Sequence, residues 1–88
     1  MYTIEAISER ETRTLRIEDD VCVLTLQAGQ THQRRFAYSD IVGVFISVHP
    51  LLCWQVGNSV YCIPVHTEDD AEAVEAFLEH IKAAQGAA

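Results

Sequence analysis

Residues 36–63, FAYSDIVGVFISVHPLLCWQVGNSVYCI, contain the clearest turn signal in the chain and therefore decide how it is expected to fold. Gly57 and Asn58 separate two runs of alternating apolar residues, 51–56 and 59–65. Two residues of this type between such runs are typical of a tight β-hairpin. The stretch therefore predicts two antiparallel strands joined by a two-residue turn.

That turn also predicts which residues pair, with Trp54 opposite Tyr61 and Cys53 opposite Cys62. Because side chains alternate along a strand, each face of the hairpin has its own set. One face carries Leu52, Trp54, Val56, Tyr61, Ile63 and Val65. The other carries Leu51, Cys53, Gln55, Val60, Cys62 and Pro64. We expect the aromatic face to line the core. The second face is less polar than a solvated face, which makes it a candidate for burial against something else.

The rest of the chain reads as short strands followed by one helix. The predicted strands are 2–7, 12–17, 21–26, 31–38, 41–48, 51–56 and 59–65. The acidic turn 18–20 leaves two registers open. If Asp19 and Asp20 form the loop, Ile17 faces Cys22, which is the register we favour; a three-residue loop would bring Val21 and Val23 to that face. A second turn, 27–30, contains Gly29.

After His66 the apolar period changes from two to between three and four residues. Thr67 is a typical N-cap, and the acidic residues that follow complement the helix dipole. Val74, Phe77 and Ile81 form an apolar stripe on the predicted helix, 68–84, which we expect to cover a sheet. Residues 85–88 are expected to fray.

Composition limits the possible functions. The 88 residues suit a single domain, 1–88, and a hydrophobic fraction of 49% excludes a disordered chain. The net charge of −7 argues against nucleic acid and anionic membranes as partners. The N-terminus lacks a signal-peptide pattern, and no apolar run is long enough for stable membrane insertion. These features predict a cytoplasmic protein.

The cysteines and histidines form no recognisable chemical site. Three cysteines without a CxxC spacing favour reduced, buried thiols. Cys53 and Cys62 face each other as a non-hydrogen-bonded pair, about 4.5 Å apart at Cα, so a disulfide remains an alternative, although cytosolic reduction argues against it. The histidines, at positions 32, 49, 66 and 80, show no metal-ligand spacing. We therefore expect no metal, no cofactor and no catalytic residue.

Basic side chains gather on the strand 31–38. His32, Arg34 and Arg35 precede Ser39 and Asp40, and are interpreted as a solvated strand face followed by a turn. Arg34 and Arg35 are the only adjacent basic pair in the chain. They either bind an acidic partner or offset the carboxylates of the helix.

Seven strands followed by one amphipathic helix is the element order of a pleckstrin-homology-like (PH-like) barrel. The run FAYSDIVGV, with Tyr38, Ser39, Asp40 and Ile41, resembles a segment of bacterial PH-like domains. CIPV, with Ile63 and Pro64, resembles the Ile-Pro that precedes their last helix. The resemblance implies an α+β fold, a split barrel of two nearly orthogonal sheets capped by the C-terminal helix.

Phosphoinositide binding is not expected from this resemblance. Eukaryotic PH domains that bind phosphoinositides hold the phosphates with basic residues in the first hairpin. The corresponding turn here, 18–20, is Glu-Asp-Asp. The expected function is instead that of a non-catalytic protein-interaction or assembly domain that self-associates as a homo-oligomer.

The candidate interface consists of outward residues of the strands 41–65. These are Phe45, Leu51, Cys53, Val60 and Cys62. One alternative is a PH-like module that binds a small ligand or lipid in the barrel interior or at an open end, although the large side chains Trp54, Tyr61 and Phe77 are expected to fill that interior. A second alternative, a cysteine-dependent enzyme, lacks an orienting group beside any cysteine.

Overall fold

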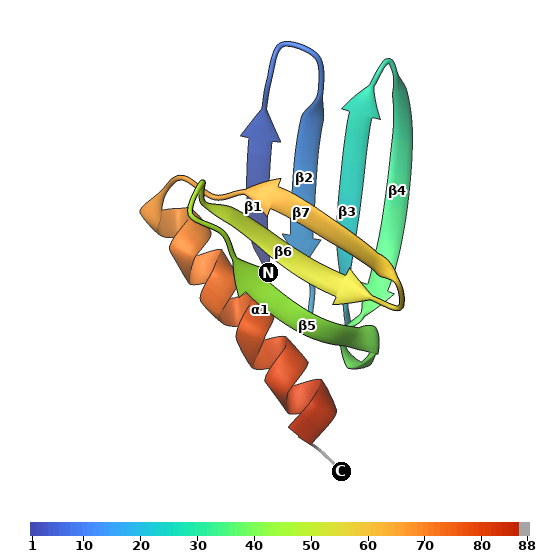
Figure 1. Cartoon of the computed structure of the whole chain (residues 1–88), viewed down its shortest axis with the longest axis vertical. Coiled ribbons are helices and arrows are strands. Elements are labelled where there is room, and N and C mark those ends of the chain that lie inside the picture. Colours follow the sequence, from blue (N-terminus) through green and yellow to red (C-terminus); the bar gives the residue numbers. More distant parts are fainter. Residues whose placement is uncertain (87–88) are drawn as a thin grey trace.

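The computed structural model describes residues 1–86 and, within them, seven antiparallel strands and one C-terminal helix (Figure 1). The fold is therefore α+β, as predicted. The strands are β1 Tyr2–Ile7, β2 Thr12–Ile17, β3 Val21–Ala28, β4 Gln30–Ala37, β5 Ile41–Ile46, β6 Leu51–Val56 and β7 Ser59–Pro64. A single 3₁₀ turn, η1 (Tyr38–Asp40), connects β4 to β5, and the helix α1 spans Glu68–Gly86.

The strands form two separate sheets. The larger has the order β1-β2-β3-β4 and the smaller the order β5-β6-β7. The strands of the smaller sheet cross those of the larger at a steep angle, and α1 lies along one side of both (Figure 1). No backbone ladder joins the sheets within the described residues, so they form an open, split barrel. The upper parts of β3 and β4 extend beyond the crossing (Figure 1).

Both predicted two-residue turns are confirmed. Ile17 pairs with Cys22, and the amide of Glu18 donates to the carbonyl of Val21 at 3.0 Å, as a loop of Asp19 and Asp20 requires. In the last hairpin Trp54 pairs with Tyr61 and Cys53 with Cys62. Gly57, at the start of that turn, has a positive φ of 60°, which residues other than glycine rarely adopt.

Several element ends differ from the predictions because turn contacts end or extend the strands. In the second hairpin Ala28 pairs with Gln30, so Gly29 alone forms the turn. β3 and β4 are therefore longer at this end than the predicted turn 27–30 allows. β5 ends at Ile46 instead of residue 48. Beyond it, the hydroxyl of Ser47 accepts hydrogen bonds from the amides of His49 and Leu51, which bends the chain before β6.

Tyr38 and Val65 lie outside the strands predicted to contain them. Tyr38 belongs to η1, and its hydroxyl donates to the carbonyl of Glu18 at 2.6 Å. The amide of Val65 donates to the carbonyl of Pro50, beyond the end of β7. Each residue is held by a contact with a distant part of the chain that the strand pattern does not reveal.

The helix continues two residues past its predicted end at 84. Gln85 lies in α1, and its amide donates to the carbonyls of Tyr38, at 3.1 Å, and of Ile41. Residues 85 and 86, which were placed in the tail, therefore belong to the helix, and Gln85 ties its last turn to η1. Residues 87 and 88 of the predicted tail lie outside the described residues.

The start of α1 is a reciprocal capping arrangement. The hydroxyl of Thr67 accepts from the amide of Asp70 at 3.1 Å. The carboxylate of Asp70 accepts from the amides of His66, at 2.8 Å, and Thr67, at 3.2 Å. The predicted N-cap is confirmed, with aspartate in the place that glutamate usually takes.

The core lies between the two sheets and is closed by α1. Trp54 is fully buried, with its ring centroid 6.0 Å from that of Phe36 on β4 and 5.7 Å from that of Phe77 on α1. Leu52 and Ile63 are also fully buried, so the aromatic face of the last hairpin is the inner face, as predicted. Within residues 1–86, no helix combines the length and apolar character needed to cross a lipid bilayer.

Candidate functional site

The face of the small sheet that points away from the core carries the five candidate interface residues. Phe45 pairs with Cys53 and Cys53 with Cys62, so these three side chains form a row across β5, β6 and β7. Leu51 and Val60 lie two residues from this row, on the same face. The register places three further residues on this face that were not among the candidates: Gly43, Gln55 and Pro64. We call these eight positions the outer face.

The outer face is uncharged and partly exposed. Phe45 is 54% exposed and Val60 55%, while Leu51 and Cys62 are half-buried. Cys53 is only 6% exposed, because it lies on the central strand between Phe45 and Cys62. A second molecule would therefore meet Phe45 and Val60 first, and Cys53 would contribute little contact.

The corresponding face of the large sheet is different in chemistry. Threonine, glutamine and arginine dominate its outward positions, as is usual for an antiparallel sheet with one face in water. They include Thr3, Thr12, Thr14, Arg16, Thr25, Gln27, Thr31, Gln33 and Arg35. The outer face of the small sheet therefore differs from the outward face of the large sheet, where Ile7, at the end of β1, is an exposed apolar exception.

The surroundings of Cys53, on this face, and of Cys22, in the core, disfavour the reactive thiolate form. All three cysteines are free, and the Cys53 thiol donates a weak hydrogen bond to the carbonyl of Leu51. Burial, followed by the proximity of Cys62, raises the pKa of Cys53. Burial also raises the pKa of Cys22 to about 12. A nucleophilic cysteine needs the opposite shift, since the thiolate is the reactive form.

Residues 1–86 contain no group of three histidine, cysteine or acidic side chains placed to hold a metal ion. His80 stacks on Tyr38, with ring centroids 5.0 Å apart. His66 follows β7, and His32 lies on β4. The described histidines are therefore dispersed over separate elements.

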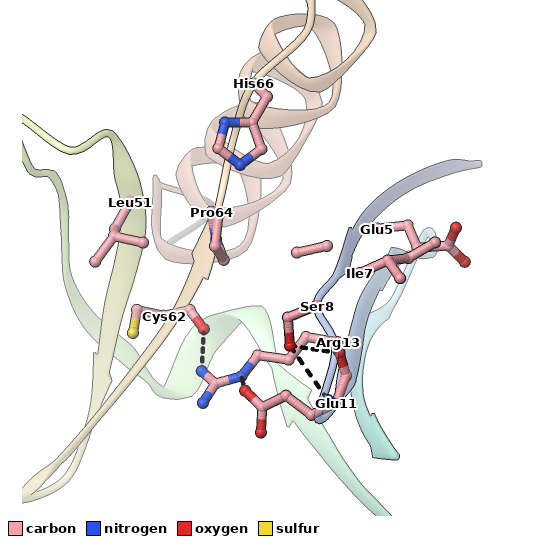
Figure 2. A pocket seen from close by; sticks show the side chains of 10 residues that line it. Glu5, Ile7, Ser8, Glu11, Arg13, Leu51, Cys62, Pro64 and His66 are labelled. Atoms are coloured by element: carbon pink, nitrogen blue, oxygen red, sulfur yellow. Dashed lines mark hydrogen bonds and ion pairs between the residues drawn. The ribbon is translucent and has the colours of Figure 1, made fainter. Parts of the chain in front are cut away.

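A concave surface that the sequence did not reveal runs along β7, the edge strand of the small sheet. One part of it, a cavity of about 490 Å³, lies between β7 and the β1–β2 hairpin. Figure 2 shows Leu51, Cys62 and Pro64 on one side of this cavity and Ile7 and Arg13 on the other.

Arg13 connects the two sides of this surface. Its Nη1 donates to the main-chain carbonyl of Cys62 at 3.1 Å, and its Nε donates to Glu11 Oε1 at 2.9 Å (Figure 2). Arg13 shares the inward face of β2 with Leu15 and Ile17, which belong to the core. On this face of β2, Leu15 and Ile17 are buried, and the uncovered part of the face begins at Arg13.

The second part is a cavity of about 540 Å³ on the other side of Arg13. It is lined by Arg13, Leu24, Leu26, His32, Arg34, Val60, Tyr61 and Cys62. Both cavities include Arg13 and Cys62, so they adjoin each other at this pair, and we call the two together the β7 groove. Alternation in the sequence places Leu24 and Leu26 on one face of β3, but the observed register is what adds Arg34 to that face. The crossing of the sheets then leaves it open.

Comparison of the chain with protein-family models, with curated proteins and with solved structures yields no match. The outer face and the β7 groove are the two surfaces of the described residues that suggest a function.

Proposed function

We propose that this chain is a non-catalytic protein-interaction domain of PH-like architecture that self-associates through the outer face. The observation that carries the proposal is the exposure of Phe45 and Val60 on a sheet face without a charged residue. A solvated antiparallel face normally alternates with polar side chains, and contiguous exposed apolar area is typical of protein contacts.

A second copy is the natural partner for such a face. In a two-fold dimer the same patch serves both subunits, so an uncharged patch faces another uncharged patch. The net charge of −7 would oppose association if charged surfaces met, whereas the outer face places no carboxylate at the contact. Phe45 and Val60 would supply the buried apolar area.

Size-exclusion chromatography with light scattering tests the proposal. The wild-type chain should elute as a dimer at high concentration, and Phe45→Glu should be monomeric because it would bury two carboxylates against each other. Val48→Glu is the matched control, since Val48 is 96% exposed and lies beyond the end of β5. A wild-type chain that stays monomeric at its solubility limit would overturn self-association, as would equal effects of the two variants.

The small-ligand alternative has less support. The interior between the sheets is occupied by Phe36, Trp54, Tyr61 and Phe77. Each ring packs on at least one of the others, with centroid distances of 4.7 to 6.2 Å between the contacting pairs. A ligand would have to bind outside this aromatic core.

A further inference from the structure

The edge strand β7 presents backbone groups to the β7 groove that no neighbouring strand pairs with, and of these the Cys62 carbonyl is bonded to Arg13. Val56 and Ser59 flank the two-residue turn, so they form a hydrogen-bonded pair, and the pattern alternates from there along the ladder. Ser59, Tyr61 and Ile63 therefore bond to β6, while the amide and carbonyl groups of Val60 and Cys62 point away from it. The hydrogen bond from Arg13 to the Cys62 carbonyl confirms this direction.

The opposite wall of the groove is the part of the large sheet that the small sheet leaves uncovered. On β4, Phe36 packs on Tyr61 with ring centroids 4.7 Å apart and is buried. Arg34, two residues along the same face, is exposed, and its partner across the ladder, Leu24, is half-buried. A strand added beside β7 would lie over Leu24 and Leu26.

The larger cavity of the groove differs in charge from the smaller cavity and from the chain as a whole. Its lining contains Arg13, Arg34 and His32 and no acidic side chain, whereas the smaller cavity includes Glu5 and Glu11 and the chain has a net charge of −7. Arg13 is paired with Glu11. Arg34 takes part in none of the ion pairs found within residues 1–86, which join Arg13 to Glu11 and Arg16 to Glu18. The larger cavity, next to Val60 and Arg34, therefore favours a negatively charged occupant.

From the free strand edge, the apolar wall and the cationic side chains together, we infer that the β7 groove binds an extended acidic peptide segment of another protein. The segment adds a strand to β7, a recurring mode of peptide recognition in which main-chain hydrogen bonds supply affinity. Val60 and the Cys62 amide provide the pairing groups.

The geometry also determines the sequence pattern of the peptide. Side chains on one face of a strand are two residues apart, so inward positions alternate with outward ones. One inward side chain is apolar and contacts Leu24 and Leu26. The next is aspartate or glutamate and pairs with Arg34, whose planar guanidinium suits a carboxylate. From Val60 to Pro64 the edge is roughly 13 Å long, enough for a segment of about four or five residues.

A pool of acetylated, amidated heptapeptides tests this inference by NMR titration of the ¹⁵N-labelled chain. Each peptide has threonine at the positions that face away from the groove. The positions that face into the groove are valine, leucine, phenylalanine or glutamate. Members that combine an apolar and an acidic inward residue should shift the amide signals of Val60 and Cys62. The same peptides with lysine in place of glutamate should not, and proline at the central threonine should abolish binding because it removes a strand donor.

Two adjacent arginines give a matched pair of variants. Arg34→Glu should lower the affinity for the tightest-binding peptide by about tenfold or more, because a charge-assisted hydrogen bond is replaced by repulsion. Arg35→Glu makes the same change in net charge on the opposite face of β4, and should alter affinity by no more than about twofold. Both positions are exposed, so both variants should keep the wild-type fold.

Three results would overturn the inference: no peptide in the pool binding at about 1 mM, equal effects of the two arginine variants, or shifts that avoid β7. Octanoate serves as a probe for a small amphipathic anion. If it shifts the Arg34 region while no peptide shifts Val60, the groove takes such an anion and not a peptide. Repeating the titration with Phe45→Glu separates this site from self-association, since peptide binding should persist in that variant.

Discussion

The Nη1 of Arg13 on β2 donates a 3.1 Å hydrogen bond to the main-chain carbonyl of Cys62 on β7, and so joins the two sheets across their open side. The two residues are 49 positions apart in the chain. The bond occupies one of the edge groups of β7 and holds the guanidinium inside the β7 groove. Arg13 therefore both links the two sheets and places a positive charge in the groove.

Replacing Arg13 should destabilise the fold more than replacing Arg16. Arg13→Met removes the bond to Cys62 and should lower the free energy of unfolding by about 1–2 kcal/mol. Arg16 forms only a side-chain pair with Glu18 and its side chain is 49% exposed, so Arg16→Met should change it by about 0.5 kcal/mol or less. Urea denaturation measures both. Equal losses in the two variants would mean that the bond between the sheets contributes nothing measurable.

Loss of the Asp70 carboxylate, which caps α1, should lower the stability of the fold more than loss of the neighbouring Asp69 carboxylate. Asp70→Ala leaves the amides of His66 and Thr67 without their acceptor and should lower the free energy of unfolding by about 1–2 kcal/mol. Asp69→Ala removes an exposed carboxylate from the same turn and should change it by only about 0.3–1 kcal/mol, through the helix dipole. Thermal and urea unfolding followed by circular dichroism compare the two. A larger effect of Asp69→Ala would contradict the capping arrangement.

Stability should fall in alkaline solution because of Cys22. Burial raises the pKa of this thiol from 9.0 to about 12, so above pH 9 the unfolded chain loses the proton while the folded chain keeps it. The unfolded state then binds fewer protons, and the free energy of unfolding decreases as the pH rises from 9 towards 12. Burial also raises the pKa of Tyr38, which adds to the decrease above pH 10.

Cys22→Ala should flatten this alkaline dependence without abolishing it. Urea midpoints measured between pH 8 and 11 test the expectation, and Cys62→Ala, which removes a half-buried thiol from the edge strand, is the control. An unchanged slope in Cys22→Ala would show that this thiol is not the group responsible.

The three thiols should react in the order of their exposure. Cys62 is half-buried, Cys53 is 6% exposed with a raised pKa, and Cys22 is fully buried. A disulfide-exchange reagent should therefore modify Cys62 first and Cys22 last in the folded chain, with the sites identified by mass spectrometry. In urea without reductant all three should react. A single reactive thiol under those conditions would instead reveal a Cys53–Cys62 disulfide.

Local patterns predicted most of the fold. The alternation of apolar residues and the pair Gly57 and Asn58 gave the pairing of Trp54 with Tyr61, because strand geometry and turn type are set by near neighbours. Element ends were less predictable. Gln85 extends α1 through hydrogen bonds to Tyr38 and Ile41, which no window of neighbouring residues contains. Ser47 ends β5 through hydrogen bonds with His49 and Leu51, which are close in the chain but are not part of the alternating strand pattern.

The sequence by itself determined that Phe45, Leu51, Cys53, Val60 and Cys62 share one face, since the register follows from a local turn. Only the tertiary structure decided which of them are accessible: the central strand hides Cys53 between its neighbours, while Phe45 and Val60 remain more than half exposed. The β7 groove was beyond sequence reasoning for the same physical reason. It exists because the small sheet covers Phe36 and leaves Arg34 open, and where one sheet crosses another depends on packing between residues far apart in the chain.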